Sequence, residues 1–220
     1  MRISNVRFAT MLFGLLVWAC AFAPHAAGQD APVSTPQERK IAVVVYDGDM
    51  IAFLGHMAGE FNITIGFEAD PLRPRPRLKF EAREATLRDI LDAVARAVPG
   101  YQWRESEGSI DFYPASGSNP LLDTSIKHFE VSNAGWSEAS DALLNLPEVQ
   151  STMIAARLSR REQPRTAAGR GGNTFSLNLE NVTLRRALHE MTKRSGNRFW
   201  IFRQDGGSGG IRFFSVGSSM

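Results

Sequence analysis

One stretch of this chain occurs twice in altered form, and this repeat constrains the fold more than any other feature. The two copies are residues 78–112 and 175–213. A chain that carries the same supersecondary unit twice is expected to build two similar units. The matching positions share an offset of 97 residues and pair Phe80 with Leu177, Ala82 with Leu179, Thr86-Leu87-Arg88 with Thr183-Leu184-Arg185, Leu91 with Leu188, and Trp103 with Trp200.

Each copy begins with alternating apolar and polar residues, which is the period of a half-buried strand. A helix then starts at Thr86 or Thr183, with apolar residues at helical spacing. Asp89 completes a capping box with Thr86, whereas Arg186 stands at the matching place in the second copy and predicts a weaker cap. Aromatic strands follow a glycine in both copies. The repeat therefore predicts strand, helix, strand, strand.

The residues before each copy extend this pattern. Residues 41–46 predict a strand, Asp49 caps an amphipathic helix, and 63–67 form the next strand. The second half restarts with a strand at 126–131 and a helix that must stop before Pro147, followed by a segment where we expect a strand around 153–156. We therefore predict an α+β fold of two tandem small βαββαβ-type units, each with two helices packed on a small mixed sheet.

The first residues predict a secretory signal peptide at 1–28. Arg2 and Arg7 precede an uncharged apolar run, and small residues stand before the expected cleavage after Gly28. A retained anchor is one alternative. A lipoprotein site at Cys20 is another, although Trp18 fits such a site poorly. We expect a periplasmic or secreted protein with no transmembrane segment in the mature chain.

The remaining chain divides by composition. We expect a flexible linker at 29–40, a first domain at 41–115, a linker at 116–125 and a second domain at 126–217. A basic, Gly/Arg-rich insertion at 159–173 interrupts the second domain. The whole chain has 25 basic and 23 acidic residues, and the signal removes two arginines, so the mature chain carries 23 of each and is neutral overall, although residues 157–170 carry five arginines and one acid.

The order of elements, the threonine-leucine start of the second helix in each unit and the closing aromatic strands resemble the short N-terminal domain of secretins and TonB-dependent transducers, called the STN domain. The resemblance covers 41–115 well and 126–216 less well, because the insertion departs from it. It implies a periplasmic module that docks onto a transport machine or passes a signal to a membrane regulator. Neither a secretin pore domain nor an outer-membrane barrel follows in this sequence, so neither whole-protein function is carried over.

The residues do not display a catalytic constellation. His56, His128 and His189 lie on separate predicted elements without metal-ligand spacing. Asp47 and Asp49 stand at a strand–helix junction, where a turn and a cap explain them. No Gly-x-Ser-x-Gly motif is present, and the one cysteine lies in the signal. We therefore expect no enzyme activity, no metal and no cofactor.

The candidate contacts are arginines and aromatic residues. Trp200 and Phe202 face away from the neighbouring apolar side chains of their strand, so both faces need a cover, which is either the other unit or a separate protein. We expect a non-enzymatic envelope adaptor that binds an unidentified envelope protein. The alternative is a periplasmic protein that binds an anionic lipid or glycan; a secreted address argues against nucleic acid. The candidate partner or anion contacts are Arg157, Arg160, Arg161, Arg165, Arg170, Trp200 and Phe202.

Overall fold

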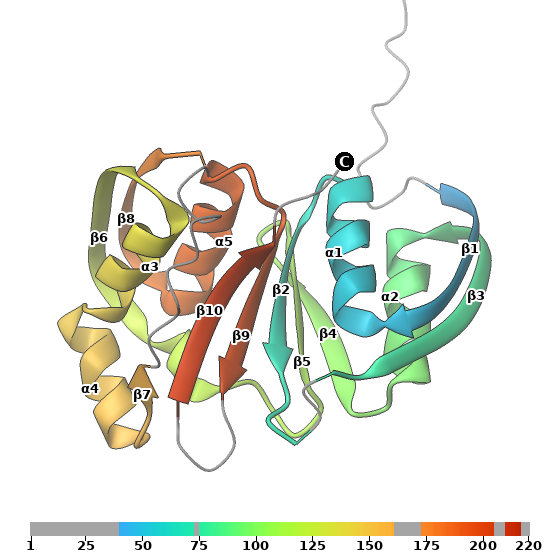
Figure 1. The fold of residues 1–220 in the computed structure, drawn as a ribbon, viewed down its shortest axis with the longest axis horizontal. Coiled ribbons are helices and arrows are strands. Elements are labelled where there is room, and N and C mark those ends of the chain that lie inside the picture. The colour runs from blue at the N-terminus through green and yellow to red at the C-terminus, as the bar shows by residue number, and fades with distance from the viewer. Residues whose placement is uncertain (1–39, 73–74, 161–172, 205–209, 217–220) are drawn as a thin grey trace, which may run out of the picture. The chain divides into compact units, whose positions relative to one another are not determined.

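The computed structural model describes residues 40–72, 75–160, 173–204 and 210–216, which belong to one unit from Ser34 to Met220 (Figure 1). The predicted signal, most of the 29–40 linker and residues 161–172 of the insertion lie outside the described residues. The class is α+β, as predicted. The first half contains β1 Lys40–Asp49, α1 Met50–Glu60, β2 Thr64–Ala69, β3 Arg77–Thr86, α2 Leu87–Ala97, β4 Tyr101–Ser106 and β5 Ser109–Pro114.

The second half repeats this order with two additions, a 3-10 helix at its start and a second helix after the first. The 3-10 helix lies within the segment that we expected to be a linker. The elements are η1 Pro120–Asp123, β6 Ser125–Ala134, α3 Trp136–Leu144, α4 Pro147–Ala155, β7 Ser159–Arg160, β8 Phe175–Thr183, α5 Leu184–Arg194, β9 Phe199–Gln204 and β10 Gly210–Val216.

The helices start where side chains cap them. Asp49 accepts backbone N–H groups at the start of α1, and Thr86 forms the expected capping box with Asp89 on α2. The side chain of Thr183 accepts a hydrogen bond from the backbone N–H of Arg186. The second hydrogen bond of a capping box, from the backbone N–H of Thr183 to a carboxylate, is missing because an arginine stands at that position. The weaker cap of the second copy is therefore confirmed.

One of the predicted strands is a helix. The strand expected around 153–156 is part of helix α4, Pro147–Ala155. Pro147 stands in the first turn, where its fixed backbone angle suits a helix and its missing N–H is no loss. Val149 and Met153 are one helical turn apart and both buried, so they form the packing face of this helix.

Each half also contains a long antiparallel ribbon of two strands. β1 pairs with β3, and β6 pairs with β8. Figure 1 shows α1 and α2 between the first ribbon and the central strands, and α3 and α5 between the second ribbon and the central strands. The ribbons cover the sides of the helices that do not face the central sheet.

The central sheet joins the two halves, which corrects our expectation of a separate small sheet in each unit. It has six strands in the order β4-β5-β2-β9-β10-β7 (Figure 1). Each half contributes three strands in the same relative order, β4-β5-β2 and β9-β10-β7. The halves meet where β2 runs parallel to β9, with Gly66 opposite Trp200 and Glu68 opposite Phe202.

The two halves cover opposite faces of the sheet at this junction. Phe199 and Ile201 of β9 belong to the core of the first half, whereas Trp200 and Phe202 belong to the core of the second. All six residues of β2 are buried. Both strands are therefore covered on both faces, and the second cover predicted for β9 is the other half of the chain.

The close approach of β2 and β9 requires a glycine. A Cβ atom at Gly66 would lie 2.3 Å from Cζ2 and 2.5 Å from Cε2 of Trp200, far inside contact distance. Gly66 therefore provides the space in which the indole ring lies across β2.

We expect Gly66→Ala to lower the free energy of unfolding by about 1–3 kcal/mol, because the added methyl group overfills this junction. Trp200→Phe removes the indole atoms that the methyl group would meet. The double variant should therefore lose less than the sum of the two single losses, measured by urea denaturation. Strict additivity would contradict the contact between these two positions.

Candidate functional site

The repeat places the same trio of side chains in both halves. Arg88 and Asp92 on α2 lie near Trp103 on β4, and the matching residues of the second half are Arg185 and His189 on α5 and Trp200 on β9. In each half the indole N–H donates to the middle residue of the trio. The first trio is open to solvent on one side, whereas the second is buried at the junction.

The buried trio meets two acids from the first half. Nη1 of Arg185 lies 2.6 Å from Oε1 of Glu68 and 3.5 Å from Oδ1 of Asp111. Arg185 also contacts Ser118 and Asp123 of the connecting segment. Glu68 additionally accepts the backbone N–H of Asn119 at 2.8 Å. The cluster therefore binds together β2, β5, the connection and α5.

These charges are almost completely removed from water. Arg185 is 5% exposed, Glu68 2%, and Asp111 1%. Burial raises the pKa of Glu68, and the charge of Arg185 and its hydrogen bonds offset this only in part. Burial also acts to raise the pKa of Asp111. The hydrogen bond from His189 and the charges of Arg185 and Arg104 outweigh burial and hold this pKa below the ordinary value. Glu68 is therefore the more easily protonated acid of the two.

The hydrogen bonds of His189 fix its tautomer. Nε1–H of Trp200 can only donate, so Nδ1 of His189, 3.1 Å away, must accept. Nε2 then carries the proton and donates to Oδ1 of Asp111 at 2.8 Å. Burial, together with the charges of Arg185 and Lys193, lowers the pKa of His189 although Asp111 acts to raise it, which agrees with a neutral ring. The neutral imidazole thus satisfies an indole donor and a carboxylate at once.

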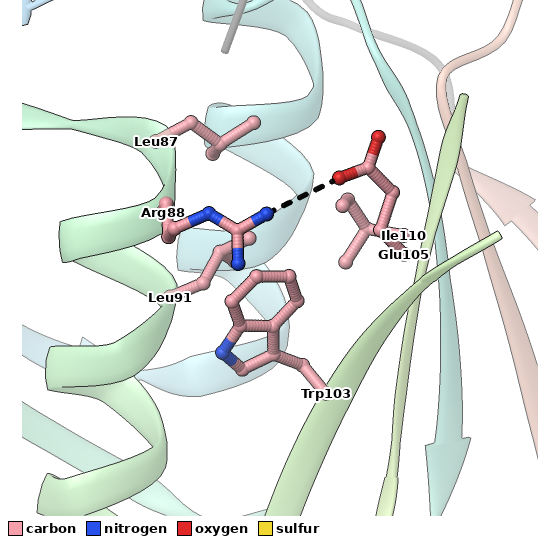
Figure 2. A pocket seen from close by; sticks show the side chains of 6 residues that line it. All are labelled: Leu87, Arg88, Leu91, Trp103, Glu105 and Ile110. Carbon is pink, nitrogen blue, oxygen red and sulfur yellow. Dashed lines mark ion pairs between the residues drawn. The ribbon is translucent and has the colours of Figure 1, made fainter. Parts of the chain in front are cut away.

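Two members of the open trio, Arg88 and Trp103, line a shallow pocket on the first half. Figure 2 shows Arg88 on α2 with its guanidinium between the ring of Trp103 and the carboxylate of Glu105. Nη2 of Arg88 lies 3.5 Å from Oε2 of Glu105, and its Cζ lies 5.3 Å from the ring centroid. Trp103 donates to Asp92 at 2.9 Å. The pocket is lined by Leu87, Arg88, Leu91, Trp103, Glu105 and Ile110.

The candidate contacts from the sequence do not gather at one place among the described residues. Trp200 and Phe202 are 0% and 1% exposed and pack inside the chain. Arg157 is exposed after α4, while Arg160 pairs with Asp141. The remaining three, Arg161, Arg165 and Arg170, lie outside the described residues.

Sequence reasoning missed the trios and the buried acids. The offset of 97 residues already aligns Arg88 with Arg185 and Trp103 with Trp200, and the same offset aligns Asp92 with His189. A further signal was the single acid in each of two strands that are otherwise largely apolar, Glu68 and Asp111. Such an acid needs a buried cation if the strand is covered on both faces.

Comparison with known proteins leaves the family open. No protein-family model matches the sequence, and no curated protein matches it significantly. Within the described ranges, no group of three or more histidine, cysteine or acidic side chains is arranged to hold a metal ion. No helix in that part of the chain is long and apolar enough to cross a membrane.

We expect Arg185→Ala to lower the free energy of unfolding by about 3–5 kcal/mol, because it leaves Glu68 and Asp111 buried without their cation. Arg88→Ala is the matched control at the same position of the first half. Its side chain is 65% exposed, so the loss should stay within about 1 kcal/mol. Equal losses in urea denaturation would contradict the role of the buried cluster.

Protonation of His189 should destabilise the fold. The pKa of His189 in the folded chain lies below the ordinary histidine value of 6.5, so the unfolded chain binds the proton first and stability falls as the pH drops below that value. His189→Gln removes this titration. The free energy of unfolding of the unmodified chain should therefore fall more steeply between pH 7.5 and 5.5, by at most about 1.4 kcal/mol per pH unit.

The comparison isolates the histidine because Glu68, Asp111, Arg185 and Lys193 are present in both proteins. The raised pKa of Glu68 acts with the opposite sign, favouring the folded state as the pH falls, and contributes to both curves. Parallel pH curves for the two proteins would show that His189 does not titrate differently in the folded and unfolded chains.

Proposed function

We propose that this chain is a non-enzymatic protein-docking module of the bacterial envelope, an adaptor that holds a partner of a secretion, uptake or signalling system. The observation that supports it most is the β2–β9 junction. There, two units of one fold are joined by parallel strand pairing and by an arginine that meets acids of the other unit. Strand addition of this kind is a general mode of protein recognition.

The ionisable side chains at the junction favour docking over catalysis. These side chains, Glu68, Asp111, Arg185 and His189, are buried and joined by hydrogen bonds and ion pairs. Their donors and acceptors therefore already have partners within the chain. A general acid or base must instead reach a substrate. The arrangement fits a group whose task is to join two units.

The envelope address rests on the sequence. The signal-like first residues and the resemblance to STN domains both favour export. An envelope adaptor also needs accessible surface for a partner. The first half offers this on β1, where Val43 and Val45 are 56% and 70% exposed, and on the pocket of Arg88 and Trp103.

Site-specific photo-cross-linking in the encoding bacterium tests this function. A photoreactive residue is placed singly at Val45 on β1, at Gln102 on β4 and at Ile154 on α4, all of which are exposed. We expect the protein in the periplasmic or membrane fraction and an adduct with one envelope protein from at least one of these positions.

Retention in the cytosol would contradict the envelope address. The absence of any protein adduct from all three positions would contradict docking. The residues used are not part of the buried cluster, so the variants should fold normally, which circular dichroism checks.

A further inference from the structure

We propose that the open edge of β4, together with Arg88 and Trp103, is a docking site for an extended segment of a partner protein. This segment pairs parallel to β4, carries a glycine opposite Trp103 and, two residues later, a carboxylate that binds Arg88. The inference rests on the proposed docking function and specifies its site and the chemistry of the partner.

The junction inside the chain supplies the precedent. Strand β2 runs parallel to β9 with Gly66 opposite Trp200, where a side chain would strike the indole ring. Two residues on, the carboxylate of Glu68 reaches Arg185 at 2.6 Å. The second half therefore recognises a strand by the pattern glycine, any residue, acid.

The first half repeats the recognising side of this junction. β4 corresponds to β9, and it is an end strand of the central sheet in the part of the chain that is described. Arg88 and Trp103 stand where Arg185 and Trp200 stand, yet the side chain of Arg88 is 65% exposed, whereas that of Arg185 is 6% exposed. Trp103 is half-buried, whereas Trp200 is fully buried, so the pair that is covered in one half is partly open in the other.

In the first half, Glu105 of β4 itself pairs with Arg88, where the second half uses a carboxylate from the neighbouring strand. Glu105 matches Phe202 in the second half, and Phe202 lies opposite Glu68. Its ion pair with Arg88 is longer than the buried pair of Arg185, 3.5 Å against 2.6 Å, and is partly open to water. Such exposed pairs contribute little, so a partner carboxylate can replace Glu105 at low cost.

Charge favours a separate partner over a second copy of this chain. The strand that corresponds to β2 at the other end of the sheet is β7, Ser159–Arg160. It brings an arginine and no acid, and Arg160 is already paired with Asp141. Ser159–Arg160 would therefore bring neither a glycine for Trp103 nor a carboxylate for Arg88 in a head-to-tail contact between copies, which disfavours it.

The test uses the full chain and a fluorescent synthetic peptide with the sequence of residues 62–70, the chain's own β2 segment. We expect saturable binding by fluorescence anisotropy, weakened at least about tenfold by Arg88→Ala, because a charge-assisted bond is lost. Arg96→Ala, an exposed change on the same helix, should alter the affinity less than about twofold. Glu105→Gln should strengthen binding, because it removes the competing carboxylate.

Peptide variants test the pattern itself. Gly66→Val in the peptide should abolish binding, and Glu68→Gln should weaken it about as much as Arg88→Ala does in the protein. Absence of saturable binding up to about 1 mM peptide, the weak end of specific affinities, would overturn the proposal. So would equal affinity for the unmodified chain and the Arg88→Ala variant, since the peptide would then bind elsewhere.

A photoreactive residue at Gln102 identifies the occupant in cells. An adduct with another envelope protein, lost on Arg88→Ala, supports the proposal. An adduct with a second copy, or within the same chain, overturns the choice of a separate partner. Adducts from Val45 but not from Gln102 would overturn this site and leave the docking function intact, so the two failures can be told apart.

Discussion

The structure depends on one junction, the parallel pairing of β2 with β9 above the Arg185–Glu68 ion pair. Without it the chain would have two three-stranded sheets, and Phe199 and Ile201 of β9 would lose the core of the first half that covers them. Strand pairing alone does not fix which residues lie opposite one another. The glycine under Trp200 and the carboxylate under Arg185 both select a single register, because a slip by one residue would put a side chain into the indole ring and a charge into the core.

Burial explains how the two copies diverged. The residue that accepts the indole N–H is Asp92 where the trio is open and His189 where it is covered. A second aspartate at 189 would stand beside Asp111 and Glu68, with Arg185 as the nearest buried cation. A neutral histidine avoids the third negative charge and also donates to Asp111. The change from Glu105 to Phe202 follows the same logic, since the covered position has no water to solvate a carboxylate.

The features that were predicted correctly from the sequence are those that depend on residues close together in the chain. Thr86 with Asp89, Pro147 and the apolar stripe of α2 determine helix ends and faces through contacts within a few residues. Two features escaped prediction for a shared reason. Helix α4 and the pairing of β2 with β9 depend on which surfaces meet after folding. The local pattern also says nothing about the burial of Glu68 and Asp111, because α5, far along the chain, covers that face and supplies a cation.

The requirement for a second cover on β9 was visible in the sequence, because its apolar residues occupy both faces. By the same reasoning, β4 does not need a second cover, because polar residues occupy its outer face. Gln102 and Arg104 occupy the outer face, and Glu105 adds a charge next to Arg88 on the inner one. Charged residues on an end strand hinder unselective pairing with other chains. Specific pairing remains open to a strand that satisfies Arg88 and leaves room for Trp103. The ion pair between Arg88 and Glu105 therefore protects this edge and, at the same time, sets the chemistry that a partner strand must supply.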